Sequence, residues 1–145
     1  MKRGRMALCA IAAAILAAAA FGQTAPVRAA DMKQLMLDLI YPSLNDIQFA
    51  ISRTPNDEAG WAAVRRSAVT LAESGNILLV RGPGNSPEWR KDVQLLVDAG
   101  FAAYKAAQAK DAAALAATGP ALDASCTTCH KQFRPNVYPK EGASK

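Results

Sequence analysis

Apolar residues recur at helical spacing along most of this chain, and this periodicity constrains its fold more than any other feature. Between positions 31 and 51 an apolar side chain returns every three or four residues, which predicts a helix of about six turns. Pro42 is expected to interrupt and kink that helix, because proline removes one backbone hydrogen bond and collides with the preceding turn. The expected buried face consists of Met32, Leu35, Met36, Leu39, Ile40, Leu44, Ile47 and Ile51.

Two further helices follow, each with a recognisable start. Asp57 is a suitable N-cap for a helix that extends to about Val80, and the segment 81–85 has the composition of a loop. Ser86 as N-cap, with Pro87 at the first helical position, starts the next helix. The expected inward faces are Trp61, Val64, Ala68, Leu71, Ala72, Leu78 and Leu79 in the first, and Trp89, Val93, Leu96, Val97, Gly100, Tyr104 and Ala107 in the second.

A fourth helix is expected from about Asp111, disturbed at 118–120 and resuming through Leu122 to Phe133. No segment alternates with period two for long enough to predict a strand, so the expected fold is all-α, an antiparallel four-helix bundle forming a single domain. Alanine dominates the last two helices. Facing alanine stripes either pack very closely or leave room for something large, such as a flat cofactor.

Residues 1–29 have the pattern of a cleaved secretory signal peptide, which predicts a mature domain at 30–145 in the periplasm. Lys2, Arg3 and Arg5 precede an alanine-rich apolar run at 6–21, which is too short and weak for a confident membrane span, and 27–29 offers a small-x-small cleavage site. Four of the 17 basic residues lie in this segment, leaving 13 against 12 acidic ones. The basic balance is therefore mostly an export feature, and nucleic acid is not an expected partner.

The mature chain would retain two cysteines, Cys126 and Cys129, followed directly by His130, the single histidine of the sequence. This is the attachment pattern of one covalently bound haem c. Two thiols about one helical turn apart can add to the two haem vinyl groups, and the next imidazole can reach the iron from the same side. The competing interpretations are a redox dithiol, a zinc half-site and a local disulfide.

The motif lies close to the C-terminus, and this position restricts the second iron ligand. Only 15 residues follow His130, and none of them is methionine. A methionine ligand must therefore come from upstream, where the mature chain offers Met32 and Met36.

These features resemble the class II c-type cytochromes, the cytochrome c′ and cytochrome c-556 group, over essentially the whole mature chain. The most specific match is the segment 126–134, in which Phe133 stands where the family usually has tyrosine. The resemblance implies a haem inside the bundle, His130 as its proximal ligand and Arg134 near a propionate. It also implies a possible homodimer through the first two helices.

Members of that family differ in the residue that lies on the far side of the haem. In this chain Met36, on the apolar face of the first helix, is the expected residue at that position, and Met32 is the second candidate. We therefore expect a periplasmic one-electron carrier with iron bound by His130 and Met36, serving unidentified redox partner proteins. The alternative is a five-coordinate binder of nitric oxide or carbon monoxide, and a third interpretation is a haem-free interaction module. No nucleophile–base pair, phosphate loop or carboxylate cluster is evident, so an enzyme is not expected.

Overall fold

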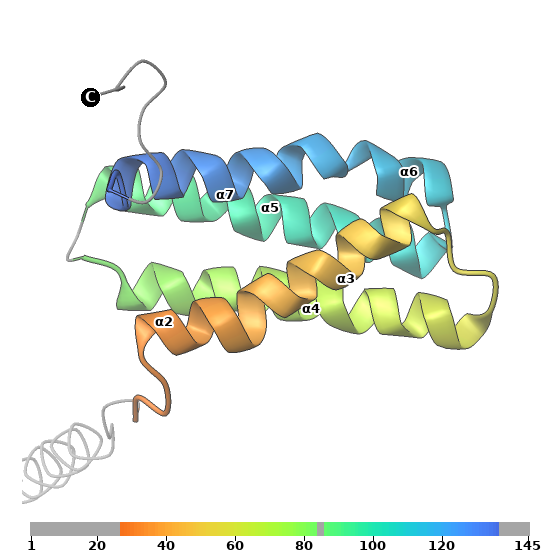
Figure 1. Ribbon diagram of the computed structural model, residues 1–145, viewed down its shortest axis with the longest axis horizontal. Helices are drawn as coiled ribbons and strands as arrows, with labels where there is room; N and C mark the ends of the chain where they lie inside the picture. The colour runs from red at the N-terminus through yellow and green to blue at the C-terminus, as the bar shows by residue number, and fades with distance from the viewer. Residues whose placement is uncertain (1–26, 84–85, 137–145) are drawn as a thin grey trace, which may run out of the picture.

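The chain folds into a bundle of packed helices (Figure 1). The computed structural model describes residues 27–83 and 86–136, and those residues contain no strand. The predicted signal segment therefore lies almost wholly outside the described residues. No helix within the described ranges is long and apolar enough to cross a membrane. The elements are α2 (Met32–Gln34), the π-helical segment η1 (Leu35–Ile40), α3 (Tyr41–Ser52), α4 (Glu58–Arg81), α5 (Pro87–Ala109), α6 (Ala112–Ala117) and α7 (Gly119–Phe133).

Side-chain caps mark the starts of α2, α4, α5 and α6, and the predicted starts at 57, 86 and 111 are confirmed. At each start a polar side chain accepts a hydrogen bond from a backbone N–H three residues later, which would otherwise lack a partner. Asp31 does the same for α2, in a reciprocal capping box with Gln34. The other bonds run from Gly60 to Asp57 at 2.7 Å, from Trp89 to Ser86 at 3.2 Å and from Ala114 to Asp111 at 2.9 Å.

Pro42 disturbs the first helix as expected, but by changing its winding and not by ending it. The Tyr41 N–H bonds to the Met36 carbonyl five residues back, so the segment before the proline is a π-helix. This wider turn moves the buried positions to Leu35 and Ile40, five residues apart. The predictions that Met32 and Leu39 are buried are wrong: each residue is 36% exposed.

The small residues of α4 and α5 allow these two helices to pack closely. A Cβ placed on Gly100 would lie 2.8 Å from the backbone nitrogen of Ala72, and one on Gly75 would lie 2.6 Å from Cγ2 of Val97. Ala99, Ala103, Ala106 and Ala107 are all buried in the same core. Close packing therefore accounts for the alanine content of α5, and any space for a cofactor must lie elsewhere.

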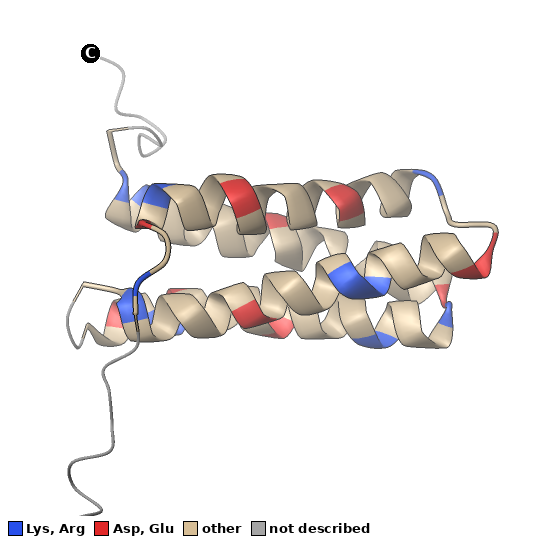
Figure 2. Ribbon diagram, turned by 90° about the horizontal axis from the view of Figure 1, so that it is seen from below, with Lys and Arg blue, Asp and Glu red and all other residues tan. Residues whose placement is uncertain are grey.

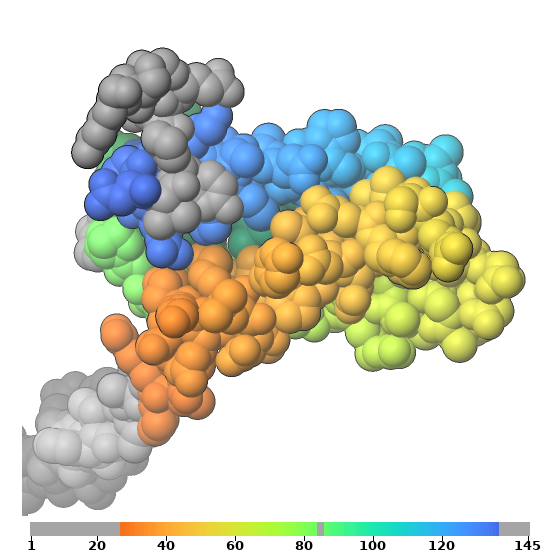
Figure 3. Space-filling view, viewed as in Figure 1, coloured from red at the N-terminus to blue at the C-terminus, as the bar shows by residue number. Residues whose placement is uncertain are grey.

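The helices approach one another differently at the two ends of the bundle. At the end where α3 finishes, α3 lies against α6 (Figure 3). At the other end η1 packs on α4, and α7 packs mainly on α5. The Trp89 indole N–H donates 2.9 Å to the Leu78 carbonyl there, which ties the start of α5 to the end of α4. α7 thus packs on α5 far more than on α2 or η1.

Candidate functional site

The candidate site lies in the last turns of α7, where Cys126, Cys129 and His130 share one helix face. Positions three and four apart on an α-helix are neighbours on its surface. Cys129 is buried at 9% exposure, whereas Cys126 and His130 are half-buried. Both thiols are free. The helix thus presents two sulfur atoms and an imidazole to the same part of the interior.

An internal cavity of about 40 Å³ lies beside this face and brings Met36 of η1 to the same site. A volume of this size holds little more than a water molecule. Apart from one carboxylate its lining is mostly apolar. The residues around it are Met36, Ile40, Leu78, Asp92, Val93, Leu96, Ser125, Cys126, Cys129 and His130. The sequence predicted that Met36, Cys126, Cys129 and His130 act together, and the fold places all four around one cavity.

An open groove of about 620 Å³ lies on the outer side of the same residues. Met36, Cys129 and His130 line both the groove and the cavity. The groove falls within the range of about 300–1,000 Å³ that is typical of cofactor pockets. Its remaining walls are Met32, Lys33, Leu37, Pro83, Trp89, Phe133 and Arg134.

The remaining predicted site residues lie along this groove. Phe133 is partly buried and packs against the core, whereas Arg134 is exposed at the groove. Met32 lines the groove but not the cavity, and its side chain is 36% exposed. Of the two methionines, Met36 is therefore the one placed next to His130 in the interior.

Burial keeps both cysteines in the thiol form. It raises the pKa of Cys126, and it raises the pKa of Cys129 to about 11 with a further contribution from the Asp92 carboxylate. A redox-active dithiol needs the opposite, because the thiolate is the reactive form and its pKa is lowered in such sites. The environment therefore argues against the interpretation of this pair as a disulfide oxidoreductase.

The imidazole of His130 is held in its neutral form. Burial lowers its pKa, and the nearby Arg134 guanidinium lowers it further. A neutral imidazole carries the lone pair that binds a metal ion. The described residues contain no cluster of three or more His, Cys, Asp or Glu side chains suited to hold a metal ion on their own.

Asp92 belongs to this site and was not predicted from the sequence. It lies within α5, is only 4% exposed and borders the cavity together with the two cysteines. The available signal was its position three residues after Trp89 and four before Leu96, on the inward face of the helix. A carboxylate at such a position is unusual and is often functional.

The aromatic residues divide between the site and the rest of the molecule. Trp61 and Trp89 are buried as expected. Phe101, in contrast, does not pack inside: it is 53% exposed, stacks on Tyr104 and lies under the Lys105 ammonium group at 4.8 Å. Its position on α5 is one residue from the buried Gly100, about 100° around the helix, which turns it toward solvent.

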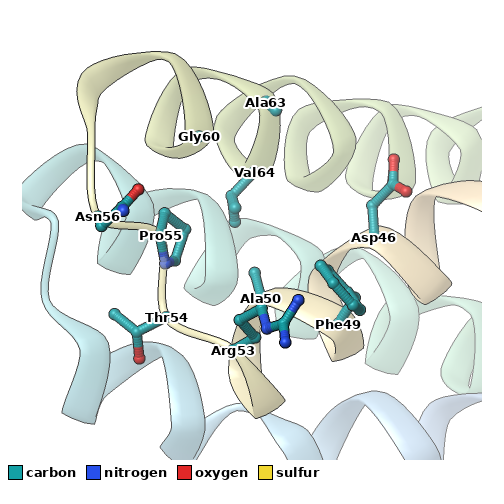
Figure 4. Close-up of a pocket in the computed structure, with 10 residues that line it drawn as sticks. All are labelled: Asp46, Phe49, Ala50, Arg53, Thr54, Pro55, Asn56, Gly60, Ala63 and Val64. Atoms are coloured by element: carbon teal, nitrogen blue, oxygen red, sulfur yellow. The ribbon is translucent and has the colours of Figure 1, made fainter.

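A second hollow, of about 570 Å³, lies at the passage from α3 to α4 (Figure 4). Exposed Phe49 and Arg53 form part of its wall, with the guanidinium 5.8 Å from the ring centroid. Asp46 accepts a 2.7 Å hydrogen bond from Ser67. The charged groups here are exposed and do not converge on the space between them. The α7 face therefore remains the candidate functional site.

Comparisons of this chain with protein-family models, curated proteins and solved structures find no match.

Proposed function

We propose that this protein is an exported monohaem c-type cytochrome of the class II kind, which carries one electron between redox partner proteins. The observation that carries the proposal is the single cavity around which Met36, Cys126, Cys129 and His130 all lie. Export is proposed from the pattern of residues 1–29.

The residues present fit a covalently attached haem c. The two thiols are free, lie one helical turn apart and face the same interior as the imidazole that follows them. Attachment adds each S–H across one vinyl group: a carbon–sulfur bond forms, the hydrogen goes to the neighbouring carbon, and no electrons are gained or lost. The cavity is small, but the groove that shares three of its residues has the volume that a cofactor requires.

When bound, haem supplies a reversible one-electron change at its iron. The chain's own residues hold and insulate it. Cys126 and Cys129 would anchor the group to α7, and His130 would offer its neutral imidazole to the iron. Met36 offers a thioether from η1. Ligation by methionine and histidine raises the reduction potential, which suits a carrier.

An antiparallel course of the helices is part of the proposal. It is supported by the contacts that join the end of α4 to the start of α5 through Leu78 and Trp89, and the start of α4 to the end of α5 through Glu58 and Lys110. Charges of both signs are dispersed along the bundle on the face in Figure 2, without a single basic stripe. This is consistent with a protein partner in place of nucleic acid.

Expression of the full chain together with a haem-maturation system tests the attachment. We expect the intact mass to exceed that of the processed polypeptide by one haem, and Cys126→Ala with Cys129→Ala to abolish the increase. Thr128→Ala is the matched control, because Thr128 is exposed between the two cysteines and should leave attachment unchanged. A wild-type mass equal to the polypeptide alone would refute the cytochrome.

Optical spectra test the carrier function and the second ligand. We expect a low-spin spectrum with a methionine–iron charge-transfer band that is lost in Met36→Ala and kept in Met32→Ala, with little carbon monoxide uptake. Retention of the band in Met36→Ala would exclude Met36 as the ligand. A high-spin spectrum with ready carbon monoxide uptake would refute the carrier and assign the protein to the binders of diatomic gases.

A further inference from the structure

Asp92 is a buried carboxylate whose charge no neighbour in the cavity compensates. Its residue exposure is 4%, and its Oδ2 atom is buried with no hydrogen-bond partner among the described residues. Burial of a polar atom without a partner costs roughly 1–3 kcal/mol by mutational measurements, and burial of a charge costs more. Asp92 therefore lowers the stability of the fold at its buried position on α5.

The groups that face Asp92 across the cavity come from α7. They are Cys126, Cys129 and His130 on α7, and the nearby Ser125 hydroxyl already donates 2.7 Å to the Leu122 carbonyl. No lysine or arginine is among the residues that line this cavity. The ionisable groups that share this cavity with Asp92 are thus those of the proposed haem attachment itself.

We propose that Asp92 acts on the iron through its charge: its carboxylate stabilises the ferric state and lowers the reduction potential of the bound haem. This inference rests on the proposed function. An oxidised haem iron carries one more positive charge than a reduced one. A fixed negative charge beside it therefore favours oxidation, and more strongly in a poorly solvated interior than at the surface. Groups that surround a metal's direct ligands commonly tune the metal in this way.

The arrangement balances two opposed effects on one iron. Methionine–histidine ligation and burial raise the potential, whereas the Asp92 carboxylate lowers it. The chain can thus set an intermediate potential without changing an iron ligand.

The test is a spectroscopic redox titration of the holoprotein as wild type, Asp92→Asn and Asp98→Asn. Asp92→Asn removes the charge with almost no change in shape. Asp98→Asn removes an equal charge from an exposed position of the same helix, where solvent screens it. We expect the potential of Asp92→Asn to lie above that of the wild type, and that of Asp98→Asn to equal it.

Asp92→Glu distinguishes an effect of the charge from an effect of altered structure. It keeps the carboxylate, and its reduction potential is expected to stay below that of Asp92→Asn. If Asp92→Asn does not accumulate, Asp92→Ser provides a smaller neutral variant. Equal potentials for wild type and the neutral variant, at equal haem content by intact mass, would overturn the inference while leaving the cytochrome intact. Absence of haem from the wild type would instead refute the proposed function, and the inference with it.

Discussion

The ring of Phe133 meets the indole of Trp89 edge to face, with centroids 5.0 Å apart and planes at 80°. The contact joins the last residue of α7 to the first turn of α5, beside the groove. Such pairs add about 0.5–1.5 kcal/mol beyond their buried area. We therefore expect a double-mutant cycle of Trp89→Leu and Phe133→Leu, measured by urea unfolding, to give a coupling of about this size.

Trp61→Leu combined with Phe133→Leu is the control for this cycle. Trp61 lies at the start of α4, the opposite end of that helix from the Leu78 carbonyl that Trp89 contacts. Distant sites usually add within about 0.5 kcal/mol. A coupling as large in the control as in the cycle would show that the energy does not come from the ring contact.

Gly100→Ala is expected to destabilise the protein although alanine favours helices. The new Cβ would press on the backbone of Ala72, which cannot move without separating α4 from α5. Overpacking of this kind costs about 1–3 kcal/mol, more than the gain of about 1 kcal/mol in helix propensity. Gly119→Ala is the matched control, because its nearest neighbour would be Ile51 at 3.8 Å. A neutral Gly100→Ala in urea unfolding would contradict the close packing.

The exposed carboxylate of Glu58 is expected to stabilise the fold only while it is ionised. Lys110 and Arg65 both contact it, the latter at 2.7 Å, and they lower its pKa from the ordinary value of 4.5. A lowered folded-state pKa means that the stabilisation is present above the unfolded-state pKa and disappears as the pH falls through the folded one. Thermal unfolding of Glu58→Gln should therefore give a lower Tm than wild type at neutral pH and the same Tm in strong acid.

Glu73→Gln serves as the control for that comparison. Glu73 lies on the same helix and accepts a hydrogen bond from Asn76, but it makes no ion pair within the described ranges. Its substitution should leave the neutral-pH Tm nearly unchanged. A Tm deficit of Glu58→Gln that persists in strong acid would show a cause other than charge.

Lys110→Gly is expected to stabilise the protein, in spite of the loss of an ion pair. Lys110 ends α5 in the left-handed conformation with φ 53°, which costs an ordinary residue about 1–2 kcal/mol and glycine little. The pair with Glu58 contributes little, because both side chains are exposed and solvent screens their charges. Lys110→Ala should be less stable than wild type, because it loses the pair and keeps the strain. The opposite order of the two variants in chemical unfolding would contradict this account.

Local signals in the sequence were sufficient to predict where the helices begin. Asp57, Ser86 and Asp111 cap them because a short polar side chain is the simplest partner for an unpaired backbone N–H, a rule that depends only on neighbouring residues. The cysteine face of α7 was equally predictable, since Cys129 and His130 lie three and four residues after Cys126, and such positions are neighbours on a helix surface.

Features that depend on distant parts of the chain were harder to predict. The burial of Leu39 was predicted wrongly because a regular helical period does not include the extra residue of η1. The place of Asp92 in the site was not predicted, because it depends on the tertiary packing that brings the cysteines of α7 to the same cavity. The sequence also left open whether the alanine-rich faces pack closely or leave space for a cofactor, because this depends on the distance between α4 and α5.

The π-helical segment η1 also affects how this protein can vary in length. Its wide turn is in effect one residue added to a regular helix. Deletion of a single residue between Leu35 and Ile40 would allow the segment to close into an α-helix, in which these two buried positions would lie four apart and still share one face. The helix from Pro42 onward would keep its register against α4. A one-residue deletion at this point would therefore shorten the chain while preserving the buried faces on both sides of it.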